Sequence, residues 1–158
     1  MRLQGGHTVA GQSYYIKAAT RLTANLTIPV QYIVATDNLP WTKETIALGV
    51  VFRNRSDVSV VYSEGKDPGF DMALLAACDA VIQSTGSYSW WAAWLANKTT
   101  TYYGYFPRPG SPLDTKCNRQ DYFPPHWIRI GNKSDLAHIR RHKRNSLESG
   151  THSDIYCT

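Results

Sequence analysis

The spacing of apolar residues alternates along this chain between the spacing typical of a helix and that typical of a strand. Apolar residues recur at helical spacing over 13–22, and 28–35 is a β-branched, apolar run. Further strands are predicted at 56–62, 80–83 and 99–105, and further helices at 70–78 and 90–96. Alternating strands and helices predict an α/β fold, a Rossmann-like parallel sheet with helices on both faces.

The pattern changes in the last third of the chain. Prolines become frequent from Phe106 onward, which predicts an ordered, extended excursion across the surface and not another strand–helix unit. Residues 131–158 are polar and charged with little periodicity, which predicts a flexible basic tail. We therefore expect one folded domain over residues 1–130 and a tail over 131–158.

The composition is sufficient for one hydrophobic core and excludes few classes of binding partner. The chain has 158 residues, of which 42% are hydrophobic, enough for a single domain. Its formal net charge of +5 suits a nucleic acid, an anionic membrane or a phosphorylated small molecule. No apolar run reaches the ~18 residues of a spanning helix, and residues 1–6 lack the features of a signal peptide. We expect neither an anchor nor a signal within the chain.

Sequons and cysteines bear on the cellular compartment. The candidate N-glycosylation sites are Asn25, Asn54, Asn97 and Asn132, which matter only in the secretory pathway. The three cysteines fit neither a zinc site nor a redox pair, so no metal is expected. Cys78 is predicted to be a buried thiol, whereas Cys117 and Cys157 are able to pair only in an oxidising compartment, and their connectivity stays open.

The candidate chemistry lies between the strand at 80–83 and the helix that follows it. The connecting loop is Ser84-Thr85-Gly86-Ser87-Tyr88-Ser89. A loop that opens a helix presents backbone N–H groups and the positive end of the helix dipole, which stabilise an anion. Glycine permits close approach, and the hydroxyls are further donors. The loop is neither a P-loop nor a dinucleotide fingerprint. Alternatively, Ser87 or Ser89 only caps the helix.

This loop and the helix before it resemble a known family. The segment Asp71-Met72-Ala73-Leu74-Leu75-Ala76-Ala77-Cys78-Asp79, followed by Ser84-Thr85-Gly86-Ser87-Tyr88-Ser89-Trp90-Trp91-Ala92-Ala93-Trp94-Leu95, is similar to the donor-site motif of the alpha-1,2-fucosyltransferases of glycosyltransferase family 11. The resemblance covers roughly residues 28–130. It implies an inverting enzyme that transfers L-fucose from GDP-fucose to the 2-hydroxyl of a terminal galactose on a glycan. It also implies that the chain is the C-terminal half of a GT-B glycosyltransferase.

By matching position, the resemblance also implies which residues bind the donor. They are Ser84, Thr85, Gly86 and Ser87 at the diphosphate, Asp71 at the nucleotide pocket and Asp37 at a strand end. For Asp37, formation of an Asx turn is the alternative to ligand binding. No metal or other cofactor is implied beside the donor. The catalytic base is unknown, since His7 and His126 are candidates by residue type alone.

The chain departs from the family in one respect. Relatives carry a His-x-Arg-Arg-x-Asp segment whose arginine neutralises the leaving pyrophosphate, and nothing before residue 28 matches it. The partial match at residues 138–141 is interpreted as coincidence in a solvated tail. We therefore expect a domain that is incomplete at its N-terminus. Its longer parent would lie in the Golgi lumen, held in the cisterna membrane by a segment absent here.

The departure leaves alternatives to an active enzyme. A truncated or inactive relative would only bind the GDP-sugar, and activity of this chain alone stays open. A remote alternative gives the basic residues 139–145 a nucleic-acid contact, but no recognition module accompanies them and no nucleic-acid partner is expected. The tryptophans at 90, 91 and 94 are predicted to pack in the core or between domains, with sugar stacking as the alternative.

Overall fold

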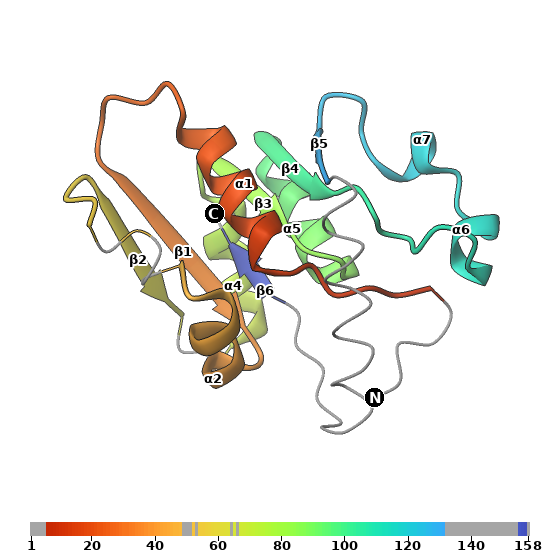
Figure 1. The fold of residues 1–158 in the computed structure, drawn as a ribbon, viewed down its shortest axis with the longest axis horizontal. Helices are drawn as coiled ribbons and strands as arrows, with labels where there is room; N and C mark the ends of the chain where they lie inside the picture. Colours follow the sequence, from red (N-terminus) through yellow and green to blue (C-terminus); the bar gives the residue numbers. More distant parts are fainter. Residues whose placement is uncertain are drawn as a thin grey trace.

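The chain forms one six-stranded sheet (Figure 1). The computed structural model describes residues 6–48, 52, 54–63, 65, 67–131 and 155–157. The strands are β1 (Val30–Thr36), β2 (Val58–Tyr62), β3 (Ala80–Gln83), β4 (Thr99–Tyr103), β5 (Ile128–Ile130) and β6 (Ile155–Cys157). They are ordered β2-β1-β6-β3-β4-β5. β1 and β2 are parallel, as are β3, β4 and β5, whereas β6 is antiparallel to both of its neighbours.

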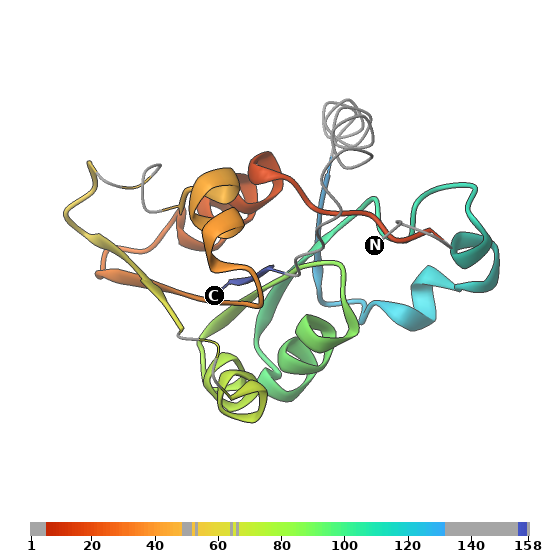
Figure 2. The ribbon, with the colours of Figure 1, turned by 90° about the horizontal axis from the view of Figure 1, so that it is seen from below.

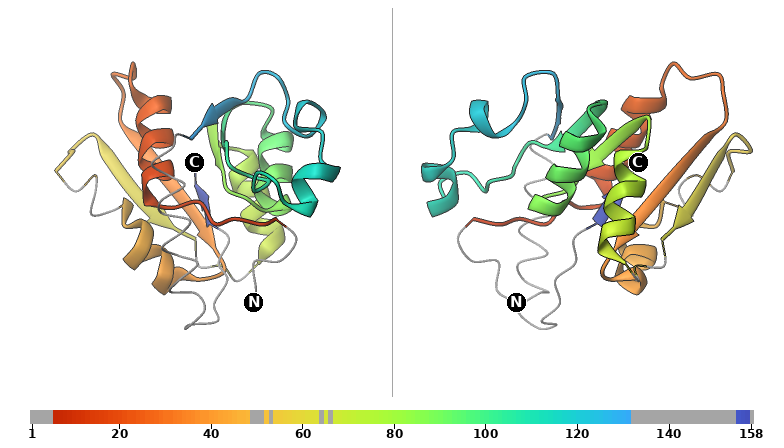
Figure 3. Two further views of the ribbon diagram at one scale, coloured as in Figure 1. Left: turned by 45° about the vertical axis from the view of Figure 1, so that its right-hand side comes forward. Right: turned by 180° about the vertical axis from the view of Figure 1, so that it is seen from behind.

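Helices cover both faces of this sheet (Figure 2). One face carries α1 (Gln12–Thr23), together with α2 (Leu39–Trp41) and the π-helical turn η1 (Thr42–Ile46) that continues it. The other face carries α4 (Pro68–Ala76) and α5 (Ser87–Ala96). Two short helices, α6 (Pro112–Lys116) and α7 (Arg119–Tyr122), lie beyond the β5 edge (Figure 3). The predicted α/β class and Rossmann-like layering are confirmed.

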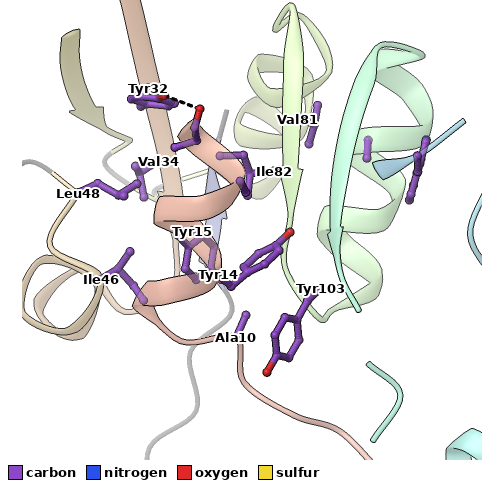
Figure 4. Close-up of a cluster of buried hydrophobic side chains, with 14 of the residues drawn as sticks. Ala10, Tyr14, Tyr15, Tyr32, Val34, Ile46, Leu48, Val81, Ile82 and Tyr103 are labelled. Atoms are coloured by element: carbon purple, nitrogen blue, oxygen red, sulfur yellow. Dashed lines mark hydrogen bonds between the residues drawn. The ribbon is translucent and has the colours of Figure 1, made fainter. Parts of the chain in front are cut away.

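The main core lies between α1 and the sheet (Figure 4). Tyr14 is fully buried, and its hydroxyl donates to the carbonyl oxygens of Gln83 and, at 3.2 Å, Thr101. Its ring meets the ring of Tyr103 edge-on, with centroids 5.2 Å apart. One buried aromatic side chain thus joins α1 to both β3 and β4, because a phenol hydroxyl taken out of water needs a hydrogen-bond partner.

A smaller core lies under α4 and α5. It consists of Ala35, Leu75 and Ala92, with Met72 and Tyr88 packed against it. Small side chains on β1 and α5 allow the helices to approach the sheet closely. The predicted helices at 70–78 and 90–96 therefore exist, and both begin earlier than their apolar patterns because Asp67 caps α4 and α5 starts at the loop after Gly86.

The segment after Phe106 contains more structure than the sequence predicted. Instead of an excursion without a further unit, it forms α6, α7 and the strand β5, which is parallel to β4. A single guanidinium holds this region together, because all five N–H groups of Arg119 donate: to the carboxylate of Asp114 and to the carbonyl oxygens of Gly104, Phe106 and Pro107. The prediction of a plain excursion was wrong because a three-residue strand leaves almost no periodic signal.

Two further predictions need correction. The turn expected after the first strand forms α2 and η1. The Asn38 side chain accepts a hydrogen bond from the backbone N–H of Trp41 at 3.2 Å, and Pro40 occupies the first turn of α2.

Within the predicted tail, Ile155–Cys157 forms β6 in the middle of the sheet. Residues 132–154 lie outside the described residues, so the flexibility predicted there stays a prediction. No helix in the described part of the chain is long and apolar enough to cross a membrane.

Candidate functional site

The candidate site is the edge of the sheet at which the parallel strands end. β1, β2 and β3 end at Thr36, Tyr62 and Gln83, and parallel pairing brings ends of this kind to one edge. The chain passes from β1 outward to β2, returns to β3 and continues outward to β4 and β5. The direction of winding therefore reverses between β1 and β3, which is where open α/β sheets form their ligand crevice.

The loop from Ser84 to Ser89 has internal hydrogen bonds that fix its shape. Ser84 and Thr85 are buried, and Ser84 Oγ lies 3.0 Å from Ser89 Oγ. Ser89 Oγ donates to the carbonyl oxygen of Gly86 at 3.1 Å, and since a hydroxyl has one proton, Ser84 must donate to Ser89. Ser84 therefore shapes the loop, while Ser87 is exposed.

The start of α5 bears on the capping alternative. Gly86 is the N-cap residue, with an extended backbone, and no side-chain hydrogen bond caps the helix. Neither Ser87 nor Ser89 is therefore the cap, because Ser87 is the first helical residue and Ser89 donates back to Gly86. The first N–H groups of a ten-residue helix, with the positive end of its dipole, are directed toward the edge of the sheet.

Asp71 is a buried carboxylate beside this loop. It lies in the first turn of α4, with 6% of its surface exposed, and it accepts a hydrogen bond from Ser63 Oγ at the end of β2. Tyr88 of α5 donates to the carbonyl oxygen of Pro68, which ties the starts of α4 and α5 together. Burial, and next the charge of Asp71, raise the pKa of Tyr88. The structure thus brings Asp71 close to the start of α5 and adds Ser63, which the sequence analysis missed.

Asp37 follows β1 at the same edge and is exposed. Its neighbour Asn38 accepts the hydrogen bond from the backbone N–H of Trp41 that caps α2, and the Asx turn considered for Asp37 stays a prediction. The loop after β2 passes close to this point, because a side-chain carbon placed on Gly65 would lie 3.2 Å from the carbonyl oxygen of Thr36. Gly65 also has a positive φ of 65°, which favours glycine. Asp37 and the Ser63–Asp71 region therefore border the same edge.

A second missed feature is the side chain of Gln83. This residue ends β3 immediately before the loop from Ser84 to Ser89 and is fully buried, yet neither its amide nitrogen nor its amide oxygen has a hydrogen-bond partner among the described residues. A buried unsatisfied polar group costs about 1–3 kcal/mol. The amide therefore offers a donor and an acceptor to water or a ligand at the base of the loop. The one feature of the sequence that could have indicated this role for Gln83 was a polar residue at the end of an apolar strand.

The two histidine candidates do not join this edge. His126 lines a hollow of about 400 Å³ with Trp94 and Asn97, at the C-terminal end of α5. A ten-residue helix is about 15 Å long, so His126 and the loop from Ser84 to Ser89 lie at opposite ends of α5. The ring of His7 lies 5.8 Å from that of Phe106. A catalytic base is therefore not identified among the described residues.

The tryptophans of α5 divide into two groups. Trp90 is half-buried, stacks on Trp94 at 5.2 Å and donates from Nε1 to the carbonyl oxygen of Tyr122 at 2.8 Å. Trp91 and Trp94 are 52% and 51% exposed. The prediction that Trp91 and Trp94 pack in the core is therefore wrong for the described part of the chain. Packing between domains and stacking on a sugar both stay predictions.

The remaining sequence candidates are mostly at the surface. Asn25, Asn54 and Asn97 are exposed, and Asn132 lies outside the described residues. Cys78 is half-buried and donates to the carbonyl oxygen of Leu74 at 3.3 Å. Cys117 is a reduced thiol whose pKa is raised by burial. The basic segments at 138–141 and 139–145 lie outside the described residues.

Comparison with known proteins decides the family. The family model described as glycosyl transferase family 11 matches residues 1–131. The chain belongs to this family. It is 31% identical over 124 residues to the galactoside 2-alpha-L-fucosyltransferase Sec1 of Mus musculus, covering 77% of this chain and 32% of that protein. It is 32% identical over 138 residues to the galactoside alpha-(1,2)-fucosyltransferase 2 of Mus musculus, covering 85% and 37%.

The family 11 chain thus spans about a third of the length of these relatives. A third relative, the galactoside alpha-(1,2)-fucosyltransferase 2 of Rattus norvegicus, is 31% identical over 138 residues. No solved structure matches the chain significantly.

Proposed function

We propose that this family 11 chain binds GDP-fucose at the loop between β3 and α5 and forms the donor-binding half of an alpha-1,2-fucosyltransferase. The observation that carries the proposal is the start of α5 at the switch point of the sheet, which begins at Gly86 without a side-chain cap. A diphosphate provides the anion that such a helix end stabilises. The names of the relatives supply the sugar, the linkage and the galactoside acceptor.

Each residue at this edge has a role in the proposal. Ser87 and the first N–H groups of α5 bind the diphosphate, while Ser84 keeps the loop in shape through its hydrogen bond to Ser89 and Thr85 is buried beside it in the sequence. The carboxylate of Asp71, held by Ser63, accepts hydrogen bonds from the N1–H and amino groups of guanine, which uracil does not present in the same arrangement. Asp37 borders the pocket on the β1 side.

In the proposed reaction, the 2-hydroxyl of galactose attacks the anomeric carbon of fucose on the face opposite the diphosphate. The carbon–oxygen bond to GDP breaks as the new glycosidic bond forms, so the configuration inverts. Negative charge grows on the leaving diphosphate, and the backbone amides and dipole of α5 stabilise it. The hydroxyl proton passes to a base outside the residues identified above.

Titration calorimetry of the purified chain with GDP-fucose, GDP and UDP tests the binding site. Ser87→Ala removes one hydrogen bond to the diphosphate, worth about 0.5–1.5 kcal/mol, and is expected to weaken GDP binding roughly 2- to 12-fold. Asp71→Asn is expected to reduce the preference for GDP over UDP. Ser59→Ala, an exposed serine on β2, is the matched control that leaves both affinities unchanged.

Two outcomes separate the proposal from its rival. Binding of GDP without fucose transfer to lactose would favour a binding-only relative, the alternative to an active enzyme. If a folded chain binds GDP and UDP equally, or if Ser87→Ala has no effect, the donor site does not lie at this loop.

We also infer that the longer parent works in the Golgi lumen at the cisterna membrane. The inference is supported by the three exposed sequon asparagines Asn25, Asn54 and Asn97. Expression of the parent in a secretory host, followed by peptide-N-glycosidase treatment, is expected to increase its gel mobility. An unchanged mobility would count against passage through the lumen.

A further inference from the structure

The C-terminal end of α5 carries apolar surface beside a hollow of about 400 Å³. Trp94 and Leu95 are both more than half exposed there. The residues that line the hollow are Ala93, Trp94, Leu95, Asn97, His126 and Trp127. None of these lining side chains is a carboxylate, an ammonium group or a guanidinium. The volume lies in the range of small-molecule sites, about 300–1,000 Å³, so the hollow suits a small, uncharged ligand with an apolar face.

The indole of Trp94 is a rigid platform in this hollow. One of its faces stacks on the ring of Trp90, with centroids 5.2 Å apart and an interplanar angle of 10°. Trp90 is held in turn, because its Nε1 donates to the carbonyl oxygen of Tyr122 at 2.8 Å. About half of the Trp94 surface stays exposed, so its other face is open to a ligand. A ring that is already fixed loses little conformational entropy when a ligand stacks on it.

A candidate glycan acceptor lies in the wall of the same hollow. Asn97 is the C-cap of α5, with a φ of 49° and a ψ of 40°, and this left-handed residue turns the chain from α5 into β4. Asn97, Lys98 and Thr99 form an Asn-x-Thr sequon, and all three residues are exposed. A glycan on Asn97 would therefore begin at the hollow, beside the open face of Trp94.

We infer that Asn97 carries an N-linked glycan whose first N-acetylglucosamine stacks on Trp94 and fills this hollow. The inference rests on the passage of the parent through the lumen, which is part of the proposed function. The C–H groups on one face of a pyranose ring are apolar and pack on an indole, while the imidazole of His126 lies across the hollow as a hydrogen-bonding partner for the polar groups of the sugar. Because the sugar is covalently attached, its effective concentration at Trp94 is high.

The modification is a group transfer whose donor is the lipid-diphosphate oligosaccharide of the secretory pathway. The amide nitrogen of Asn97 forms a bond to the anomeric carbon of the oligosaccharide, and the bond from that carbon to the diphosphate oxygen breaks. One amide proton passes to a base of the transferring enzyme, and the lipid diphosphate leaves with the electron pair. Exposure of the whole sequon at a turn makes the acceptor accessible to that enzyme.

The test uses the full chain, secreted by yeast behind a fused signal peptide. Asn25→Gln, Asn54→Gln and Asn132→Gln leave Asn97 as the one acceptor, and endoglycosidase H trims its glycan to a single N-acetylglucosamine. The same chain from a bacterial host carries no sugar. The sugar is expected to raise the urea midpoint by about 0.5 M, the shift that one contact of the strength of an aromatic pair produces in a domain of this size. The ring current of Trp94 should also move the sugar's N-acetyl methyl signal upfield.

Two variants show whether the indole is responsible. Trp94→Leu removes the ring and keeps the sequon, so both effects of the sugar should disappear. Glycosylated and bare forms of this variant are compared with each other, which cancels any effect of the substitution on folding. A chain whose one acceptor is Asn54 is the matched control, because the exposed ion pair of Arg55 and Asp57 follows that sequon. Its sugar should change neither the midpoint nor the methyl signal.

The outcomes separate this inference from the proposed function. An Asn97 that stays bare while Asn54 is modified would overturn the inference, and so would effects of the sugar that persist in Trp94→Leu. Polypeptide of the parent or a second copy of the chain would then cover this face. The fused signal peptide makes these results independent of the route that the parent itself takes. A secreted parent in which mass spectrometry finds Asn97 bare but Asn54 modified would overturn the inference alone, whereas a parent without any glycan would overturn the luminal proposal as well.

Discussion

Tyr14 offers the sharpest test of how the core supports the donor loop. Its hydroxyl donates to the carbonyl oxygens of Gln83 and Thr101, the first of which lies one residue before the loop. Tyr14→Phe removes one oxygen atom and leaves the ring in contact with Tyr15 and Tyr103. The substitution therefore tests the hydrogen bonds without creating a large cavity.

The expected loss follows from the burial of the partners. One net hydrogen bond contributes about 1 kcal/mol, and a buried acceptor left unsatisfied adds about 1–3 kcal/mol. Because two carbonyl oxygens share one donor, we expect the free energy of unfolding to fall by about 2–3 kcal/mol. With a urea dependence of roughly 2 kcal/mol/M for a domain of this size, the midpoint should fall by about 1–1.5 M.

Urea unfolding followed by tryptophan fluorescence measures this shift. Tyr105→Phe is the matched control, because Tyr105 is half-buried and its hydroxyl makes no hydrogen bond to any described residue, so the substitution should change the free energy of unfolding by less than about 0.5 kcal/mol. Equal effects of the two substitutions would refute the reasoning. An unchanged midpoint for Tyr14→Phe would show that water replaces the lost donor.

The other predictions concern caps, the guanidinium and pH. Asn38→Ala removes the side-chain cap of α2 and should lower the free energy of unfolding by about 1 kcal/mol in urea melts, with Asn25→Ala as an exposed control. Arg119→Lys leaves several carbonyl oxygens unpaired and should cost about 3 kcal/mol, and a loss below about 1 kcal/mol would contradict the bonding described. Hydrogen bonds from Gly110 and Arg119 lower the pKa of Asp114. The carboxylate therefore contributes stability above the ordinary carboxyl pKa, and this contribution is lost as pH falls through the lowered value. Asp114→Asn should make the free energy of unfolding depend less on pH in this acid range. Burial raises the pKa of Tyr122. The stability that its neutral hydroxyl contributes is therefore retained below about pH 10 and lost as pH rises through the raised value. Thermal melts of wild type and Tyr122→Phe across this pH range measure the loss.

Local sequence determined much of the fold. The strands β1, β2, β3 and β4 and the helices α1, α4 and α5 were predicted because each carries enough consecutive residues for a periodic pattern. The candidate loop also followed from local order, since a serine-rich turn between a strand and a helix requires no distant contact. Short elements such as α2 and β5 were not predictable in this way, because three residues hold no period.

Tertiary structure decided how these pieces form a site. Asp71 was visible in the sequence, but its pairing with Ser63 depends on the end of β2 meeting the start of α4. The exposure of Trp91 and Trp94 likewise follows from which face of α5 meets the sheet, a choice that helical spacing alone does not make. The position of β6 between β1 and β3 depends on hydrogen bonds between residues more than 70 apart along the chain. Sequence specifies such contacts only through the whole fold, because backbone pairing carries no residue-specific pattern that a local reading detects.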